Sequence, residues 1–410
     1  MIEPSDLQST TGRGSDAENA SLKTFPDADQ RRYHSRIPEL DGIRGLAITM
    51  VLVWHYFNCL TGPVERRTAT FIASRLTTLA WSGVDLFFVL SGFLIGGILL
   101  DNSNNLGFTK SFFIRRLFRI VPAYCIFLIT FHICGLLLNR NQFGWAIDSN
   151  ISIFSCLLMC QNFAMAIGGS FGSNSLGVTW SLAVEEQFYC LIITIFLAFG
   201  ARRASRILLQ LAVAAVVIRL LMPGFHAYVL LPFRMDSLGF GFAVACVIRS
   251  EKALTWCLEH CRDLLITLVL LLLSAGAATW KGGMGELQHT FLAILYGFVV
   301  LLAVLNTGHS SMAILRCKAL SMIGLYSYSI YLFHQLILGL MHGYFLGQRP
   351  AIQSTSEIAI TLGALVITFG LSSIIYHTIE KPFIQVGKRY SYSPDKSHGR
   401  TVAGLTDGPA

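Results

Sequence analysis

The chain has 410 residues, of which 53% are hydrophobic and only 13% are charged. This composition excludes an ordinary soluble domain and predicts an all-α, polytopic bundle of transmembrane helices. The net charge of +8 does not indicate a nucleic-acid partner, because the basic residues lie beside hydrophobic segments, as membrane orientation signals do.

The two ends of the sequence are polar. Residues 1–36 contain no apolar run, so we expect a disordered cytoplasmic tail and no cleavable signal peptide. Residues 37–385 form the predicted transmembrane domain, and residues 386–410 form a second disordered tail. The ten cysteines lie in or beside apolar segments without a metal-binding pattern, so we predict no metal site.

Hydrophobic segments follow one another along the whole predicted domain. In chain order they lie near 43–60, 81–100, 119–138, 151–167, 180–199, 206–222, 229–248, 264–280, 288–306, 320–342 and 357–379. The fourth is short and polar. If it stays outside the membrane, most Lys and Arg residues fall on one side, so the positive-inside rule predicts about ten spans with both termini cytoplasmic. Residues 139–179 then form an external excursion, which is a lid, an acceptor site or a plain linker.

The first segment carries Arg44 and, eleven residues later, His55. In a helix this step is about three full turns and about 16 Å, so both side chains point the same way. His55 then lies about half a bilayer deep. An ionisable residue at that depth is either a functional group or a histidine hydrogen-bonded between helices.

The second span carries a small-residue pair and one carboxylate. Gly92 and Gly96 are four residues apart, which favours close approach of another helix. Asp85 is a candidate substrate contact that either orients a polar partner or is an interfacial carboxylate. Ser91 lacks the Gly-x-Ser-x-Gly elbow, so we do not predict a serine nucleophile.

Three arginines precede the third span. Arg116 and Arg119 share one helix face, whereas Arg115 points more to the side. Two guanidiniums on one face can bind phosphate oxygens bidentately, although positive-inside anchoring alone would also place arginines here. Pro122 is expected to kink or open the helix and to free backbone groups near the same site.

Adjacent carboxylates open the segment at 180–199. Glu185 and Glu186 lie about 100° apart on a helix, so one can face a polar cavity while the other pairs elsewhere. We assign Glu186 to catalysis, as a partner of His55, and Glu185 and Tyr189 to substrate contacts.

Further polar residues lie inside later spans. Arg234 and Asp236 are expected to neutralise charges within the bundle. His334 is a second buried histidine, and its neighbours Tyr328 and Tyr331 suggest hydrogen-bonded packing or contact with an acceptor.

Six stretches in this order resemble the acyltransferase-3 family of membrane O-acyltransferases. They are Asp-Gly-Ile-Arg-Gly at 41–45, Gly-Val-Asp-Leu-Phe-Phe-Val-Leu-Ser-Gly-Phe at 83–93, Arg-Arg-Leu-Phe-Arg-Ile-Val-Pro at 115–122, Trp-Ser-Leu-Ala-Val-Glu-Glu-Gln-Phe-Tyr at 180–189, Tyr-Ser-Tyr-Ser-Ile-Tyr-Leu-Phe-His at 326–334 and Glu-Lys-Pro at 380–382.

The resemblance implies transfer of an acyl group, usually acetyl from acetyl-CoA, to a hydroxyl of a cell-surface polysaccharide, glycolipid or related metabolite. It implies a plasma (inner) membrane location in the lipid bilayer and acyl-CoA as donor substrate, without a permanently bound cofactor. Arg44 and His55 match the family's arginine and histidine pair, and Arg116 and Arg119 match its Arg-x-x-Arg motif. Only polar residues follow 385, as in stand-alone members that lack an added hydrolase-like domain.

The residues leave two mechanisms and a rival class open. His55 can act as a general base toward a sugar hydroxyl or form a transient acyl-imidazole, with His334 as the second candidate. A proton-coupled or small-molecule transporter would also place His, Asp, Glu and Arg inside spans. Homo-oligomerisation stays open.

Overall fold

The computed structural model describes residues 37–61, 69–102, 107–281 and 284–392. These residues form helices and loops without a β-strand, which confirms the predicted all-α class. From the first helix onward the α-helices are α3 (Pro38–Tyr56), α4 (Ala69–Leu76), α5 (Gly83–Asn102), α6 (Phe108–Leu137), α7 (Arg140–Ile147), α8 (Ile153–Leu157), α9 (Gln161–Gly168), α10 (Asn174–Gly177), α11 (Trp180–Leu221), α12 (Phe225–Val229), α13 (Met235–Arg249), α14 (Glu251–Glu259), α15 (Cys261–Lys281), α16 (Gln288–Leu305), α17 (Lys318–Leu346), α18 (Thr355–Ile375) and α19 (Lys381–Lys388).

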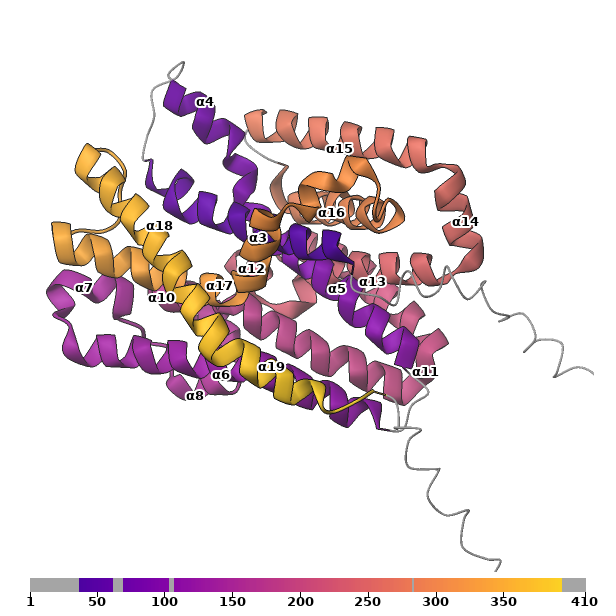
Figure 1. Cartoon of the computed structure of the whole chain (residues 1–410), viewed down its shortest axis with the longest axis horizontal. Helices are drawn as coiled ribbons and strands as arrows, with labels where there is room; N and C mark the ends of the chain where they lie inside the picture. Colours follow the sequence, from indigo (N-terminus) through magenta and orange to yellow (C-terminus); the bar gives the residue numbers. More distant parts are fainter. Residues whose placement is uncertain (1–36, 62–68, 103–106, 282–283, 393–410) are drawn as a thin grey trace, which may run out of the picture. The chain divides into compact units, whose positions relative to one another are not determined.

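Short helical turns connect several of these helices. The turns are η1 (Asn58–Leu60), η2 (Thr78–Ser82), η3 (Leu231–Phe233), η4 (Gly285–Leu287), η5 (Ser310–Arg316) and the π-helical η6 (Tyr376–Glu380). Figure 1 shows α3 and α5 in the middle of the bundle, with α15 along its upper edge and α6 along its lower edge.

Eight helical segments of the described chain are long and apolar enough to cross a membrane. This number differs from the predicted ten for two local reasons. The segments at 180–199 and 206–222 are counted together, because α11 consists of two helical parts that meet at a kink at Gly200 (φ 70°, ψ 164°). The segment at 229–248 yields α13 with 15 residues, about 22 Å long, which is less than the hydrocarbon thickness of a bilayer. The count of about ten and the cytoplasmic termini stay predictions.

The predicted boundaries of segments and of the domain differ from the observed helices at several positions. The segment at 151–167 folds as α8 and α9, and neither helix reaches the length of a span. Helix α19 continues past the predicted domain end at 385, to Lys388. The tail predicted at 1–36 and residues 393–410 of the second tail lie outside the described residues.

Close packing of α5 against α13 depends on glycine. A Cβ atom at Gly92 would lie 1.9 Å from the carbonyl oxygen of Leu238, and one at Gly241 would lie 1.9 Å from that of Val89. Any larger residue would therefore push the two backbones apart. This close approach is the one predicted from the glycine spacing, and it brings the first turns of α5 and α13 together.

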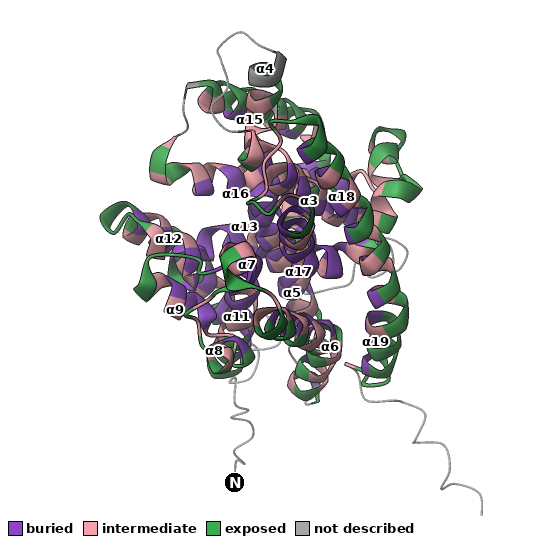
Figure 2. Ribbon diagram, turned by 90° about the vertical axis from the view of Figure 1, so that its left-hand side faces the viewer, coloured by how far each residue is buried: buried purple, intermediate pink, exposed green. Residues whose placement is uncertain are grey.

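Helices α3 and α17 cross in the same way. A Cβ at Gly45 would lie 2.1 Å from the carbonyl oxygen of Leu320, and one at Gly324 would lie 2.1 Å from that of Asp41. The contact fixes the two helices beside each other, so that their following turns also meet. Buried residues gather on α3, α5, α13 and α17, whereas α15 and α19 are largely exposed (Figure 2).

Candidate active site

Two of the cavities within the described bundle contain the predicted site residues. The arginine cavity has a volume of about 110 Å³ and is lined in part by Arg44, Arg116, Arg119 and Glu185. The histidine cavity has a volume of about 780 Å³, and its lining includes His55. Val84 and Tyr331 line both cavities, so the wall between them is one side chain thick at these positions.

The arginine cavity brings together cations from two helices. Arg44 comes from α3, and Arg116 and Arg119 come from α6, as their shared helix face predicted. Arg115 lines neither cavity, because its guanidinium lies 4.2 Å from the centre of the Tyr392 ring. The donor contact predicted for Arg115 therefore has no geometric support, whereas three guanidiniums face one space.

Helix α6 continues through Pro122 without ending. The predicted opening is therefore absent from the helix as described. The carbonyl oxygen of Ile120, which lines the arginine cavity, accepts a hydrogen bond of 2.9 Å from the hydroxyl of Tyr328.

Glu185 is the carboxylate of the arginine cavity. Its Oε1 accepts a hydrogen bond of 2.8 Å from Ser91, and its Oε2 accepts one of 3.1 Å from Tyr189. The ring of Tyr189 in turn lies 5.1 Å from the guanidinium of Arg116. These contacts fix the carboxylate beside the arginines. Both residues predicted as substrate contacts, Glu185 and Tyr189, thus line this cavity.

Glu186 lines neither cavity. Its Oε1 is buried and has no hydrogen-bond partner among the described residues. The expected division between two adjacent carboxylates is thus present, but the residue assigned to catalysis is the one outside the cavities. A contact between Glu186 and His55 is not part of the structure.

His55 and His334 meet at the crossing of α3 and α17. Nε2 of His334 lies 3.1 Å from Nδ1 of His55. Nδ1 of His334 lies 2.8 Å from the carbonyl oxygen of Tyr331, and Nδ1 of His55 lies 3.0 Å from that of Val51. Both histidines predicted as chemical groups therefore belong to one hydrogen-bonded pair.

These partners assign the tautomers. A carbonyl oxygen only accepts, so Nδ1 of each ring carries the hydrogen and donates it. In a neutral imidazole the other nitrogen is then an acceptor, so the single hydrogen on Nδ1 of His55 is shared between the carbonyl oxygen of Val51 and Nε2 of His334 in a three-centre hydrogen bond. Nε2 of His55 is left with a free lone pair, on a ring that lines the histidine cavity.

Asp85 has a polar partner, as one of the predicted alternatives states, but it has no geometric support as a substrate contact. It is 1% exposed, lines neither cavity and pairs with Arg234 of the turn before α13. Asp236 pairs with Arg219 at 2.6 Å, which confirms the expected neutralisation of charges within the bundle. The described residues contain no group of three or more His, Cys, Asp or Glu that could hold a metal ion.

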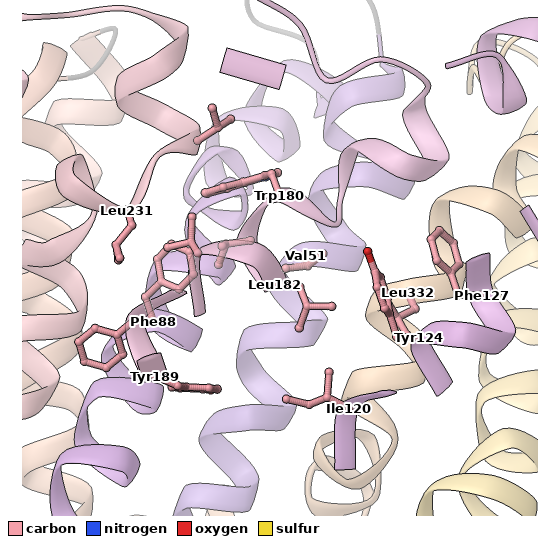
Figure 3. Close-up of a cluster of buried hydrophobic side chains, with 14 of the residues drawn as sticks. Val51, Phe88, Ile120, Tyr124, Phe127, Trp180, Leu182, Tyr189, Leu231 and Leu332 are labelled. Carbon is pink, nitrogen blue, oxygen red and sulfur yellow. The ribbon is translucent and has the colours of Figure 1, made fainter. Parts of the chain in front are cut away.

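Aromatic side chains of the histidine cavity were not predicted. Its lining includes Trp54, Trp81, Trp180, Phe171, Phe225 and Tyr228. Figure 3 shows Trp180 in the upper part and Tyr189 in the lower part of the buried cluster, with Val51 and Leu182 at intermediate height. Tryptophans at the ends of hydrophobic segments are the sequence feature that could have indicated this aromatic lining. Phe171 and Asn174 also show that the excursion at 139–179 contributes to this cavity.

Tyr331 is held rigidly in the shared wall. Its hydroxyl donates to the carbonyl oxygen of Val178 at 2.7 Å and lies 2.6 Å from Oγ of Ser181. Its ring centre lies 5.9 Å from that of His334. The predicted hydrogen-bonded packing of this tyrosine is therefore confirmed, and it separates the arginines from the histidine pair.

Long apolar helices that enclose a cationic cavity and a histidine cavity define an integral membrane protein with a buried polar site. The chain belongs to the acyltransferase-3 family, whose acyltransferase domain matches residues 37–377. No solved structure matches it.

Curated relatives are about one-quarter identical to this chain over the aligned residues. "Putative peptidoglycan O-acetyltransferase YrhL" of Bacillus subtilis is 28% identical over 87% of this chain and 56% of its own length. Peptidoglycan O-acetyltransferase OatA of Listeria monocytogenes is 27% identical over 87% of this chain and 57% of its own length. The chain thus spans little more than half the length of these relatives.

Proposed function

We propose that this chain is a membrane O-acyltransferase that uses acyl-CoA, in the first instance acetyl-CoA, as donor. The observation that carries the proposal is the histidine pair, because it leaves Nε2 of His55 unprotonated on a ring that lines the larger cavity. A sugar hydroxyl is a poor nucleophile at neutral pH, and a positioned neutral imidazole is a suitable base for it.

The donor is proposed to bind at the arginine cavity. Three guanidiniums suit the phosphates of coenzyme A, and Arg binds such oxyanions in a bidentate manner. A volume of about 110 Å³ suits only the narrow acyl end of the donor, so we place the nucleotide outside the cavity on the side of the arginines. The thioester is proposed to reach the histidine cavity at the wall of Val84 and Tyr331 that the two cavities share. In the proposed orientation this side faces the cytoplasm, where acyl-CoA is found.

The acceptor is proposed to bind in the histidine cavity. Its volume of about 780 Å³ is typical of sites that enclose a small-molecule ligand. Aromatic rings and the amides of Gln288, Gln335 and Asn174 suit the faces and hydroxyls of a sugar. Since named relatives are peptidoglycan O-acetyltransferases, we propose a cell-surface polysaccharide built on N-acetylated sugars as the acceptor class.

In the proposed transfer an ester bond replaces the thioester bond, and one proton moves from the acceptor hydroxyl to coenzyme A. Nε2 of His55 takes the hydroxyl proton while the acceptor oxygen attacks the thioester carbonyl, and the carbon–sulfur bond then breaks. The coenzyme A thiolate leaves and takes the proton back from His55, giving the ester and the free thiol. The same lone pair would suit an acyl-imidazole intermediate, in which His55 carries the acyl group between donor and acceptor.

Reconstitution tests this function directly. The purified full chain in proteoliposomes is supplied with radiolabelled acetyl-CoA and chitotetraose, the tetramer of N-acetylglucosamine. The expected result is a sugar product heavier by one acetyl group, with release of coenzyme A. Label that stays on the protein when the sugar is omitted would indicate the acyl-imidazole route. Solute uptake into the vesicles without consumption of acetyl-CoA would contradict the proposal in favour of a transporter.

A further inference from the structure

Arg234 lies outside both cavities but contacts the walls of both. Its guanidinium carbon lies 5.4 Å from the ring centre of Phe88, 5.7 Å from that of Tyr228 and 6.0 Å from that of Trp180. Phe88 lines the arginine cavity, whereas Tyr228 and Trp180 line the histidine cavity. One cation therefore contacts three rings that enclose the proposed substrates.

Arg234 uses only one guanidinium nitrogen for a hydrogen bond, so most of its guanidinium group is available for contact with the aromatic rings. One terminal nitrogen pairs with Asp85, but Nε and the other terminal nitrogen have no hydrogen-bond partner among the described residues. The side chain is only 1% exposed, so these donors are desolvated. Buried donors without partners are destabilising, and the negative faces of aromatic rings are the available compensation.

The rings that Arg234 contacts also hold one another. The centres of Trp180 and Tyr228 are 4.8 Å apart, and Trp180 lies edge-on to Phe88 at 5.8 Å. His289, whose Nδ1 lies 3.6 Å from Asp85, contacts the ring of Tyr228 at 5.7 Å and that of Trp81 at 5.3 Å. A single buried cluster of Asp85, Arg234 and His289 thus lies behind three aromatic residues of the histidine cavity.

We propose that Arg234, anchored by Asp85, is a positioning residue that fixes Trp180 and Tyr228 for acceptor binding. The inference rests on the proposed function, since the rings matter only if an acceptor lies against them. Arg234 does not touch the acceptor and takes no proton. Its role is to hold the aromatic wall in one arrangement, so that the reacting hydroxyl meets Nε2 of His55.

Arg219 is a matched control. It is equally buried, also 1% exposed, and also pairs with an aspartate of α13, Asp236. Its other donors bond the carbonyl oxygens of Phe233 at 2.6 Å and Glu286 at 3.0 Å. Arg219 lines neither cavity, and none of its contacts with the described residues is to a ring of the histidine cavity.

The first measurement is fluorine NMR of the full chain labelled with fluorotryptophan, which needs no acceptor. The resonance of Trp180, assigned with Trp180→Phe, should shift and broaden in Arg234→Met but stay unchanged in Arg219→Met. Arg234→Lys keeps the ion pair with Asp85 but lacks the planar guanidinium, so it should fold and still disturb Trp180. An unchanged Trp180 resonance in both Arg234 variants would overturn the proposal.

The second measurement is the kinetics of acetyl transfer to chitotetraose. Loss of the cation should raise the KM for the sugar about tenfold, as expected for a desolvated cation–π contact, and leave the KM for acetyl-CoA unchanged. Arg219→Met should lower the amount of folded protein without changing either KM. Equal KM values for chitotetraose in the parent and in folded Arg234→Met would overturn the positioning role. Absence of transfer by the parent would count against the proposed function, while the NMR result would still decide whether Arg234 orders the rings.

Discussion

Nε2 of His334 lies 3.1 Å from Nδ1 of His55, although 279 residues separate the two histidines in the chain. A backbone carbonyl orients His334, and His334 then orients His55. This series of contacts resembles in principle the way a buried acceptor holds a catalytic imidazole in its working tautomer. His334 is therefore expected to act through His55 rather than on the substrate.

Replacement of His334 should reduce transfer without abolishing it. In His334→Ala, Nδ1 of His55 keeps the carbonyl of Val51 but loses its second partner, so the ring is less well oriented. We expect transfer to fall about 10- to 100-fold, as for other residues that orient a reactive group. His342→Ala is the control, since His342 is buried on the same helix and bonds Thr361 instead. Equal losses in both variants would indicate damage to α17 rather than a role in orientation.

The arginines of the smaller cavity should govern donor affinity. Arg116→Lys and Arg119→Lys keep the charge and the orientation signal but lose the bidentate fork, so acetyl-CoA binding should weaken while membrane insertion stays normal. Arg115→Lys is the matched control, because Arg115 stacks on Tyr392 away from the cavity. Calorimetric titration with acetyl-CoA provides the measurement. Parent-like affinity in both Arg116 and Arg119 variants would leave anchoring as their sole role.

The adjacent carboxylates should respond differently to neutralisation. Glu185→Gln deprives Ser91 or Tyr189 of a charged acceptor, so we expect about a tenfold loss of transfer. Glu186→Gln should keep near-parent transfer, because Glu186 lines neither cavity and its Oε1 has no partner within the described chain. Initial rates of acetyl transfer compare the two. A larger loss in Glu186→Gln would restore the catalytic role predicted from the sequence.

Topology can be tested with single cysteines in a cysteine-free background. Ser170 is exposed beside Phe171, which lines the histidine cavity, and Arg203 is exposed on α11. If both termini are cytoplasmic, an impermeant thiol reagent should label Ser170→Cys in intact cells and label Arg203→Cys only after permeabilisation. External labelling of Arg203→Cys would reverse the proposed sides of the two cavities.

The sequence predicts most of the helices and many of the polar residues of the site, but it does not predict which faces of different helices contact one another. Periodicity predicts which residues share a face of one helix, as for Arg116 and Arg119, because that relationship depends only on the helical repeat. It does not define how α17 is rotated against α3, so the contact of His55 with His334 could not be derived. The partner of Asp85 was missed for the same reason, since Arg234 is 149 residues away.

Helix lengths were also limited by local features that composition does not reveal. The two apolar segments predicted as separate spans are both helical, and they meet at Gly200, whose non-helical φ and ψ kink the chain within α11. The segment at 229–248 was expected to span, but it turns at Arg234 before α13 begins at Met235. An arginine that must meet Asp85 in the core is thus accommodated by shortening the helix.

The most direct test of the account compares binding and transfer in His55→Ala. The variant and the parent are reconstituted at equal amounts, acetyl-CoA affinity is measured by calorimetry, and acetylation of chitotetraose is followed by mass spectrometry. Because a general base contributes about 10²- to 10⁴-fold, transfer should fall by at least that lower factor while acetyl-CoA affinity stays at the parent value. His260→Ala, which alters a half-buried histidine stacked on Trp256 and outside both cavities, should match the parent in both measurements. Near-parent acetylation by His55→Ala would contradict the assignment of His55 as the chemical group.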